Sequence, residues 1–360
     1  MPNDARERTK WKARLTDWID QCRVSRPVRK LMAEATLGVL SSGSLQLSDI
    51  ARSLKEPMGL HHTLKRLSRM LSRHSEVAWA AEDLLLRKLG AQVTDEMVLA
   101  IDPGDLNRDG AEKSERLCRV RDGSSGEIVN GYPLMSVVAR DIRQGHTFPL
   151  LTRLLSTAGP SYKSENHDIL YTMETVQRYL SARPLWVIDR GGDRGVLWKT
   201  WIEDEWDVLV RADNKRFWLW RDGEKTAQQI ARDLPLKHQG KLTRRSQESV
   251  RFGITQVSLR AHPEKQLAMV VVRHGKQQPL VLVTTRPVRG RRQGERLMQA
   301  YLDRWACEEG YRFSKQGFSL EKVQVRKFAS LQNLVALATL AWGLLACHQS
   351  NSPILLKKAK

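Results

Sequence analysis

The sequence predicts a mixed α/β (α+β) protein, with a helical N-terminal region and a β-rich segment in the second half of the chain. Three observations support this class. Apolar residues recur at helical spacing through residues 1–95, short apolar runs typical of buried strands begin near residue 96, and strand-like segments dominate 206–285. The chain has 360 residues, of which 41% are hydrophobic, so it is long enough for several domains around a substantial core.

The charge of the chain indicates a polyanionic partner. Sixty lysines and arginines stand against forty acidic residues, which gives a net charge of +20. Such a surface attracts nucleic acid above all. The four cysteines show no CxxC pairing, so neither a zinc site nor a disulfide framework is predicted. The N-terminus lacks the apolar stretch of a signal peptide, and we expect a cytoplasmic, nucleoid-associated protein with no membrane partner.

The N-terminal 95 residues are expected to form a helical DNA-binding region. Two short helices, over 48–54 and 60–71, flank a break that contains proline and glycine. The second helix has a basic outer face, on which Lys65, Arg66 and Arg69 are the candidate DNA contacts. This pattern suits a helix-turn-helix, although a helical bundle with solvated lysines and arginines is equally compatible with it.

Two aspartates follow short, wholly apolar runs typical of buried strands. Asp102 comes directly after 97–101, and Asp189 comes directly after 184–188, with a predicted helix over 166–180 between them. Residues at the ends of strands are exposed at the edge of a sheet, while their backbone is held rigidly. Two carboxylates that converge there would bind Mg²⁺, which prefers carboxylate oxygen. Each sequence taken alone is also compatible with an ordinary turn.

The segment from Tyr301 to Lys315 places four polar side chains on one side of a predicted helix. At about 100° per residue, Tyr301, Arg304, Glu308 and Lys315 fall within an arc of about 60°. A metal-binding carboxylate flanked by donors for phosphate oxygens is what phosphodiester chemistry needs. A solvated stripe of charges is the alternative. A buried helix over 330–347 follows, in a C-terminal segment, 331–360, that ends in a basic tail.

These motifs resemble DDE transposases of the insertion-sequence-four (IS4-like) group. The last segment matches the Tyr-x2-Arg-x3-Glu-x6-Lys signature of that group at Tyr301, Arg304, Glu308 and Lys315. Residues 186–193 resemble the second-aspartate motif of the group, and 99–105 resemble the first-aspartate strand less closely. The resemblance covers about residues 95–330, and it implies an RNase H-like catalytic core from 96–205 and 286–330, interrupted by a β-rich insertion over 206–285.

The resemblance also implies a mechanism. Asp102, Asp189 and Glu308 would hold two Mg²⁺ ions, with Mn²⁺ as a substitute, for cleavage at transposon ends and strand transfer into target DNA. The partners would be double-stranded DNA (the terminal repeats and the target) and a second copy of the chain, as a homodimer on DNA. Tyr301, Arg304 and Lys315 would grip DNA phosphates, and Arg211 is a further candidate contact.

The sequence departs from the group in ways that leave alternatives open. Pro103 and Gly104 follow the first aspartate, which makes Asp105 a competitor for its role. Glu309 competes with Glu308 but lies about 100° away from it on the helical wheel. A catalytically inactive DNA-binding repressor and a stand-alone RNase H-like nuclease are alternative functions. All three carboxylates are present, which favours an active enzyme.

Overall fold

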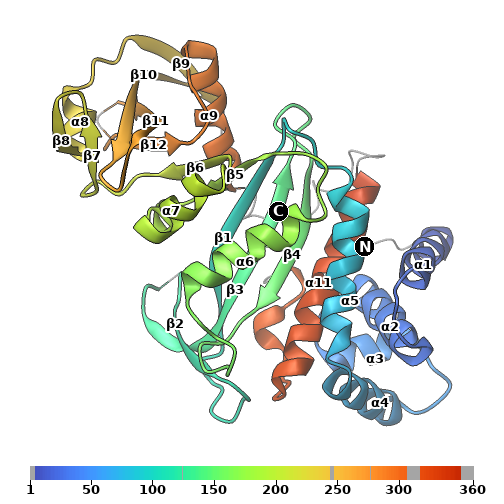
Figure 1. Cartoon of the computed structure of the whole chain (residues 1–360). Coiled ribbons are helices and arrows are strands. Elements are labelled where there is room, and N and C mark those ends of the chain that lie inside the picture. Colours follow the sequence, from blue (N-terminus) through green and yellow to red (C-terminus); the bar gives the residue numbers. More distant parts are fainter. Residues whose placement is uncertain (1–4, 124, 244–246, 276, 306–316, 350–360) are drawn as a thin grey trace.

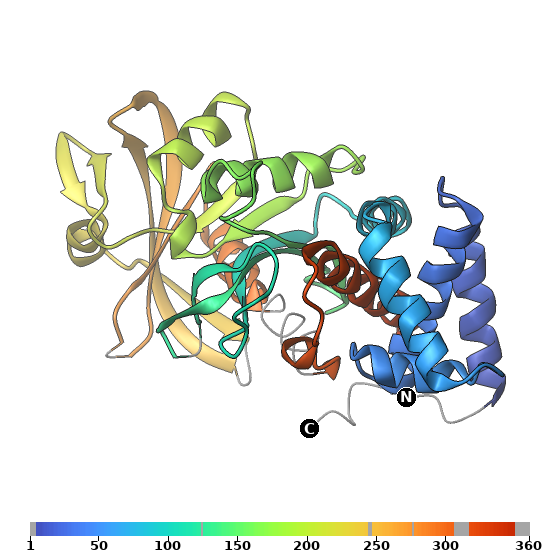
Figure 2. The same ribbon diagram turned by 90° about the horizontal axis from the view of Figure 1, so that it is seen from below.

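The chain folds into a helical body joined to one long sheet. The computed structural model describes residues 5–123, 125–243, 247–275, 277–305 and 317–349. The helical body contains α1 (Ala5–Asp20), α2 (Arg26–Ser42), α3 (Leu47–Leu54), α4 (Leu60–Arg73), α5 (Glu76–Gly90) and α11 (Phe328–Gln349). Figure 2 shows this body at one end of the molecule, the β-rich strands at the other end, and the central strands between them.

Five strands form the central part of the sheet. They are β1 (Val98–Asn107), β3 (Ile128–Arg140), β4 (Thr147–Leu154), β5 (Leu185–Ile188) and β6 (Val208–Arg211). Their order in space is β4-β3-β1-β5-β6, with β1, β5 and β6 parallel to one another and β3 antiparallel to both of its neighbours. The carboxyl ends of three buried parallel strands therefore lie at one edge of the sheet. The predicted mixed α/β class is confirmed.

The β-rich strands continue this sheet beyond β6. They are β7 (Phe217–Trp220), β8 (Gly223–Thr226), β9 (His238–Thr243), β10 (Gln247–Leu259), β11 (His262–Arg273) and β12 (Leu280–Thr284), with the helix α8 (Ala227–Asp233) beside them. The strand β12 pairs with β6, and β11 and β10 follow. The predicted insertion over 206–285 thus begins with β6, a strand that pairs with β5 in the central sheet. Its status as a separate unit stays a proposal.

The two faces of the central strands pack against different helices. Side chains alternate along a strand, so residues two apart share a face. Leu99 and Trp186 belong to the larger hydrophobic core, which also holds the buried residues of α6 (Glu165–Gln177) and α7 (Gly195–Glu203). Val98, Leu185 and Leu209 face the opposite way, into a second core that contains Met298 and Tyr301 of α9 (Arg291–Asp303).

The helix α11 comes from the C-terminal part of the sequence and completes the helical body formed by the N-terminal helices. It contacts β4, α5, α2 and α4, which come from the first half of the sequence. Its 20-residue apolar window is long enough to span a membrane, but 78% of the helical window is buried inside the protein. This burial confirms the prediction of a buried C-terminal helix. The short strand β2 (Cys118–Arg121) pairs with β3, and the 3-10 helix η3 (Leu320–Lys322) contacts β1.

Two details of the predicted elements are wrong. The strand predicted over 97–101 does not end before Asp102 but continues through Pro103 and Gly104 to Asn107, because β3 pairs with β1 without interruption over this stretch. Pro103 is tolerated there since β5 ends at Ile188, which leaves that side of β1 open. Leu60, which its helical spacing with Leu67 and Leu71 predicts to point inward, is 43% exposed, because α4 begins at this residue and packs through the two later leucines.

A buried amide holds α11 against the N-terminal helices. Asn333 is fully buried, and its side-chain amide donates to the backbone oxygens of Leu71 (2.8 Å) and His74 (2.9 Å). Its side-chain oxygen accepts from the backbone N–H of Ala78 at 2.9 Å. One side chain thus satisfies the backbone at the end of α4 and the start of α5, where helices leave such groups unpaired.

Replacing this amide should destabilise the whole chain. We expect Asn333→Ala to lower the free energy of unfolding by about 3 kcal/mol, because buried backbone groups are left without their partners. Urea denaturation followed by circular dichroism measures the change. The control is Gln228→Ala, an exposed position on α8, which should change the stability by less than about 0.5 kcal/mol. Equal effects of the two substitutions would contradict the role given to Asn333.

Candidate active site

The register of the parallel strands places two aspartates side by side. Val98 lies beside Leu185, and Ala100 lies beside Val187. Two residues farther along each strand, the same register places Asp102 beside Asp189. Both side chains are half-buried, and both come where the pairing of β1 with β5 ends. The strands therefore hold two carboxylates at the same height at the carboxyl edge of the sheet.

The next strand adds a cation to this row. Ile188 of β5 lies beside Val210 of β6, so Asp189 comes beside Arg211. By strand alternation, the three side chains point to the face of the sheet that Val98, Leu185 and Leu209 share. That face is covered by α9. The predicted DNA contact Arg211 is thus brought to the two predicted metal ligands.

The last turn of α9 brings two more predicted residues to the row. The Arg304 guanidinium lies 3.4 Å from a carboxylate oxygen of Asp102, and it lies 5.7 Å from the centre of the Tyr301 ring. Burial raises the pKa of the Tyr301 phenol, and Arg304 and a hydrogen bond with Arg211 oppose this rise. The phenol therefore stays protonated at neutral pH. Four of the predicted residues therefore lie around Asp102: Asp189, Arg211, Tyr301 and Arg304.

The loop after β5 fixes the carboxylate of Asp189. Its side-chain oxygen accepts a hydrogen bond from the backbone N–H of Gly191 at 2.7 Å, and this bond caps the 3-10 helix η1 (Arg190–Gly192). A β-carbon at Gly191 would lie 2.9 Å from that same oxygen, closer than side chains tolerate. A glycine is therefore required here for the carboxylate to keep its position.

A second carboxylate of this loop anchors it to the far side of β6. Asp193 is buried, and it accepts hydrogen bonds from the Trp198 indole (2.7 Å) and the Asp213 backbone (2.6 Å). Its ion pair with Arg216 is 2.5 Å long. Burial raises the pKa of the Asp193 carboxyl, and these partners oppose the rise. No role for Asp193 was predicted from the sequence, although its place four positions after Asp189, within the motif over 186–193, was the available signal.

The competing aspartate of β1 lies on the other face of the sheet. Asp105 is three residues from Asp102 along an uninterrupted strand, so the two side chains point to opposite faces. Asp105 is buried and accepts a hydrogen bond from the backbone N–H of Gly123 at 3.1 Å. Asp105 therefore stabilises the turn that contains Gly123. It lies on the face of the sheet away from Asp189 and α9.

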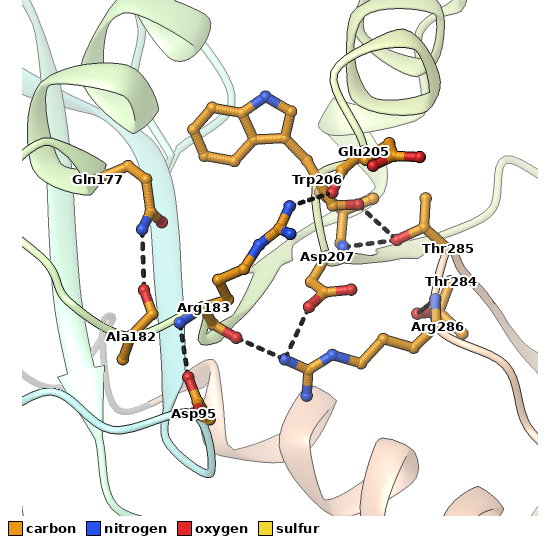
Figure 3. Close-up of polar contacts among 11 residues, drawn as sticks. Asp95, Gln177, Ala182, Arg183, Glu205, Trp206, Asp207, Thr284, Thr285 and Arg286 are labelled. Carbon is orange, nitrogen blue, oxygen red and sulfur yellow. Dashed lines mark hydrogen bonds and ion pairs between the residues drawn. The ribbon is translucent and has the colours of Figure 1, made fainter.

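A polar network at the amino ends of β1, β5 and β6 holds the link that leads into α9 (Figure 3). Arg286, in the link from β12 to α9, donates to the backbone oxygen of Arg183 (2.8 Å) and to Asp207 (3.1 Å). The backbone N–H of Arg183 donates to Asp95 at 2.7 Å. Thr285 exchanges hydrogen bonds with the backbone at the start of β6 (2.7 and 2.9 Å). The entries to β1, β5, β6 and α9 are thereby fastened together.

Glu308 and Lys315 lie outside the described residues, as does the competitor Glu309. Within the described ranges, no group of three or more His, Cys, Asp or Glu side chains is arranged to hold a metal ion. Asp102 and Asp189 nevertheless supply hard oxygen donors in register, and the Arg304 cation lies against Asp102. This donor set fits a divalent ion that takes oxygen ligands, with a further carboxylate to complete the site.

The basic face of α4 divides into two kinds of residue. Arg66 forms ion pairs with Glu34 of α2 and with Glu56, both at 2.6 Å, and its side chain is largely buried. It therefore fastens α4 to α2. Lys65 and Arg69 are exposed. The structure thus gives Arg66 a structural role, whereas Lys65 and Arg69 stay candidate DNA contacts.

The comparison with protein families decides the identity of this chain. The family model described as "Transposase DDE domain" matches residues 149–344, more than half of the chain. This chain belongs to the DDE transposase family. It is therefore an enzyme that cleaves and transfers DNA, and a divalent metal ion is expected of the family. The matched region contains Asp189, Arg211, Tyr301 and Glu308 but begins after Asp102, so the position of Asp102 rests on the strand register.

A solved structure supports the fold. The chain is similar to the piggyBac transposase in a cryo-EM structure of its synaptic complex with hairpin DNA, with a TM-score of 0.50 and 12% sequence identity. The alignment covers 96% of this chain and 72% of the other. At this identity the likeness concerns the fold, and it agrees with an RNase H-like core. Among curated proteins, no significant match was found.

A methyl group beside Asp189 should impair cleavage without unfolding the protein. We expect Gly191→Ala to reduce DNA cleavage about 10- to 100-fold, because the added carbon displaces the carboxylate and small misplacements are costly in catalysis. Gly195→Ala is the matched control, since no heavy atom lies within 4 Å of its added carbon. Nicking of a supercoiled plasmid that bears the element's ends measures both. Equal activity of the two variants would refute the positioning role.

The α4 face offers a second test. We expect Lys65→Ala with Arg69→Ala to weaken DNA binding, with a slope of log K against log [salt] that is shallower by about 0.9 for each phosphate that the variant no longer neutralises. Arg66→Ala should instead lower the unfolding midpoint in urea, because it leaves Glu34 and Glu56 without this partner. Unchanged salt dependence in the double variant would indicate that α4 does not face DNA.

Proposed function

We propose that this chain is an IS4-type transposase that cuts DNA at transposon ends and joins the freed ends to target DNA. The observation that carries the proposal is the shared register of Asp102 and Asp189 beneath Tyr301 and Arg304 of α9. Rigid strands hold the carboxylates, and a helix end supplies the phosphate donors. In this proposal Asp102, Asp189 and Glu308 hold two Mg²⁺ ions, for which Mn²⁺ substitutes.

In this proposal, different residues of the protein bind the metal ions and the DNA phosphates. When bound, a pair of ions at such a site supplies activation of the attacking oxygen and stabilisation of the leaving oxygen. Asp102 and Asp189 present the oxygen ligands from neighbouring strands. Arg304 and Arg211 are guanidinium donors suited to phosphate oxygens, and the protonated Tyr301 phenol adds a neutral donor. Lys315 is proposed as a further phosphate contact.

The proposed partners follow from charge and from the family. The net charge of +20 supports double-stranded DNA, both terminal repeats and target, as the substrate. The DNA in the piggyBac complex supports the same partner. We also propose that the protein acts as a homodimer on DNA, since two ends must be cut together, and that it is cytoplasmic and nucleoid-associated.

The decisive experiment compares the wild type with carboxamide variants of the proposed ligands. On supercoiled plasmid bearing the element's terminal repeats, with Mg²⁺ or Mn²⁺, the wild type should nick the repeat ends. Asp102→Asn, Asp189→Asn and Glu308→Gln should each reduce nicking by more than about 100-fold, because even residues that only orient metal ligands are worth 10- to 100-fold. All three variants should still bind the repeats.

The control for these variants is Asp105→Asn, on the opposite face of β1, which should continue to nick the ends. Retained activity in Asp102→Asn with loss in Asp105→Asn would reverse the assignment of the first aspartate. If the wild type binds the repeats but does not cut them, the repressor alternative replaces our proposal. If it cuts but never joins ends to an added target plasmid, the nuclease alternative does.

A further inference from the structure

A basic groove lies between the β-rich strands and the outer face of α9. Its volume is about 960 Å³, and β9, β10 and α9 contribute most of its lining. Its charged side chains are Lys241, Arg251, Arg291, Arg292, Glu295 and Arg296. Five cations thus face a single carboxylate across an open groove that is separate from the row of Asp102, Asp189 and Arg211.

Most of this positive charge has no counterion within the part of the chain that the structure describes. Arg291 lies 3.5 Å from Glu295, and Arg251 donates a hydrogen bond to the backbone oxygen of Leu236. Lys241, Arg292 and Arg296 are exposed, and no ion pair joins them to a described carboxylate. Like charges this close repel one another, so the groove is suited to a ligand with several negative charges.

The shape of the groove is fixed by close contacts between α9 and the strands. A β-carbon at Gly294 of α9 would lie 2.6 Å from the Phe252 ring of β10. A β-carbon at Gly240 of β9 would lie 3.0 Å from the Glu295 carboxylate. The glycine at 294 allows the helix to come this close to β10. The backbone positions that carry the cations of α9 and of the strands are therefore fixed relative to one another, which favours a ligand of regular geometry.

The groove shares its helix with the candidate active site. Arg296 precedes Tyr301 by five residues and Arg292 precedes it by nine, so they lie about 7.5 and 14 Å from it along the helix axis. A DNA strand carries one phosphate per 3.4 Å of its axis, so these distances correspond to roughly two to four base pairs. The catalytic row also lies on the face of the sheet that α9 covers.

From this arrangement we infer that the groove binds the phosphate backbone of the duplex that is being cut, two to four base pairs away from the cut. The inference rests on the proposed function, to which it adds a second contact region. Evenly spaced phosphates match cations that come from β9, β10 and α9 along one groove. Arg292 and Arg296 are the central contacts, with Lys241 and Arg251 on the opposite wall.

The first test measures binding alone, so that it does not depend on catalysis. The probe is a fluorescent random-sequence DNA duplex of about 40 base pairs, titrated by anisotropy between about 50 and 200 mM salt. We expect the double variant Arg292→Ala with Arg296→Ala to make the negative slope of log K against log [salt] shallower by roughly 1.8, about 0.9 for each phosphate that is no longer neutralised.

The matched control removes the same charge from the other end of β10. Arg260→Ala with Lys265→Ala changes two exposed residues near the β10–β11 turn and should leave the slope as in the wild type. Equal slopes in the groove variant and the wild type would overturn the inference. An equally shallow slope in both double variants would also overturn it, because the effect would then reflect net charge and not the groove.

The second test locates the contact on DNA that carries the element's ends. Neutral methylphosphonates replace single phosphates at increasing distance from the cut. We expect those two to four base pairs away to weaken binding by the wild type about tenfold and to leave binding by the groove variant unchanged. Equal weakening in both proteins would overturn the inference. If the wild type binds but never cuts, the proposed function fails, while the binding results still decide the groove.

Discussion

The parallel pairing of β1, β5 and β6 is the constraint on which the candidate site depends. It converts three residues that are far apart in sequence into one row, because Asp102, Asp189 and Arg211 occupy the same height on adjacent strands. Hydrogen-bonded ladders buried between helices resist sliding, since a shift of one residue would turn every apolar side chain to the wrong face. The packing of the core beneath them therefore fixes the position of the two carboxylates.

The second requirement is that α9 lies at the right height above this row. The link that precedes it is fastened by Arg286, its first turn comes close to β10 at Gly294, and its end places Tyr301 and Arg304 over the strands. The β-rich strands are joined to the same sheet through β12. Helix, strands and the edge that carries the candidate site are thus parts of one packed unit, so residues near the start of α9 keep a fixed position relative to its last turn.

Much of this arrangement could be predicted from local patterns, and the rest depended on distant pairing. The apolar runs before Asp102 and Asp189 identify both strands because wholly buried strands lack polar residues. The sequence Pro103-Gly104 instead suggested a turn, and only β3, pairing from outside that segment, keeps it extended. Likewise, the basic pattern of α4 cannot distinguish Arg66, whose acceptors lie on other segments, from its exposed neighbours.

The position of α11 has a consequence for how the chain is made. The N-terminal helices emerge first from the ribosome, yet their apolar surface and the ends of α4 and α5 are completed by Asn333 and its neighbours. Until those residues are synthesised, the first helices lack their principal partner. A truncated product that ends before α11 would expose this surface to chaperones and proteases. Completion of the helical body therefore has to wait until α11 has been translated.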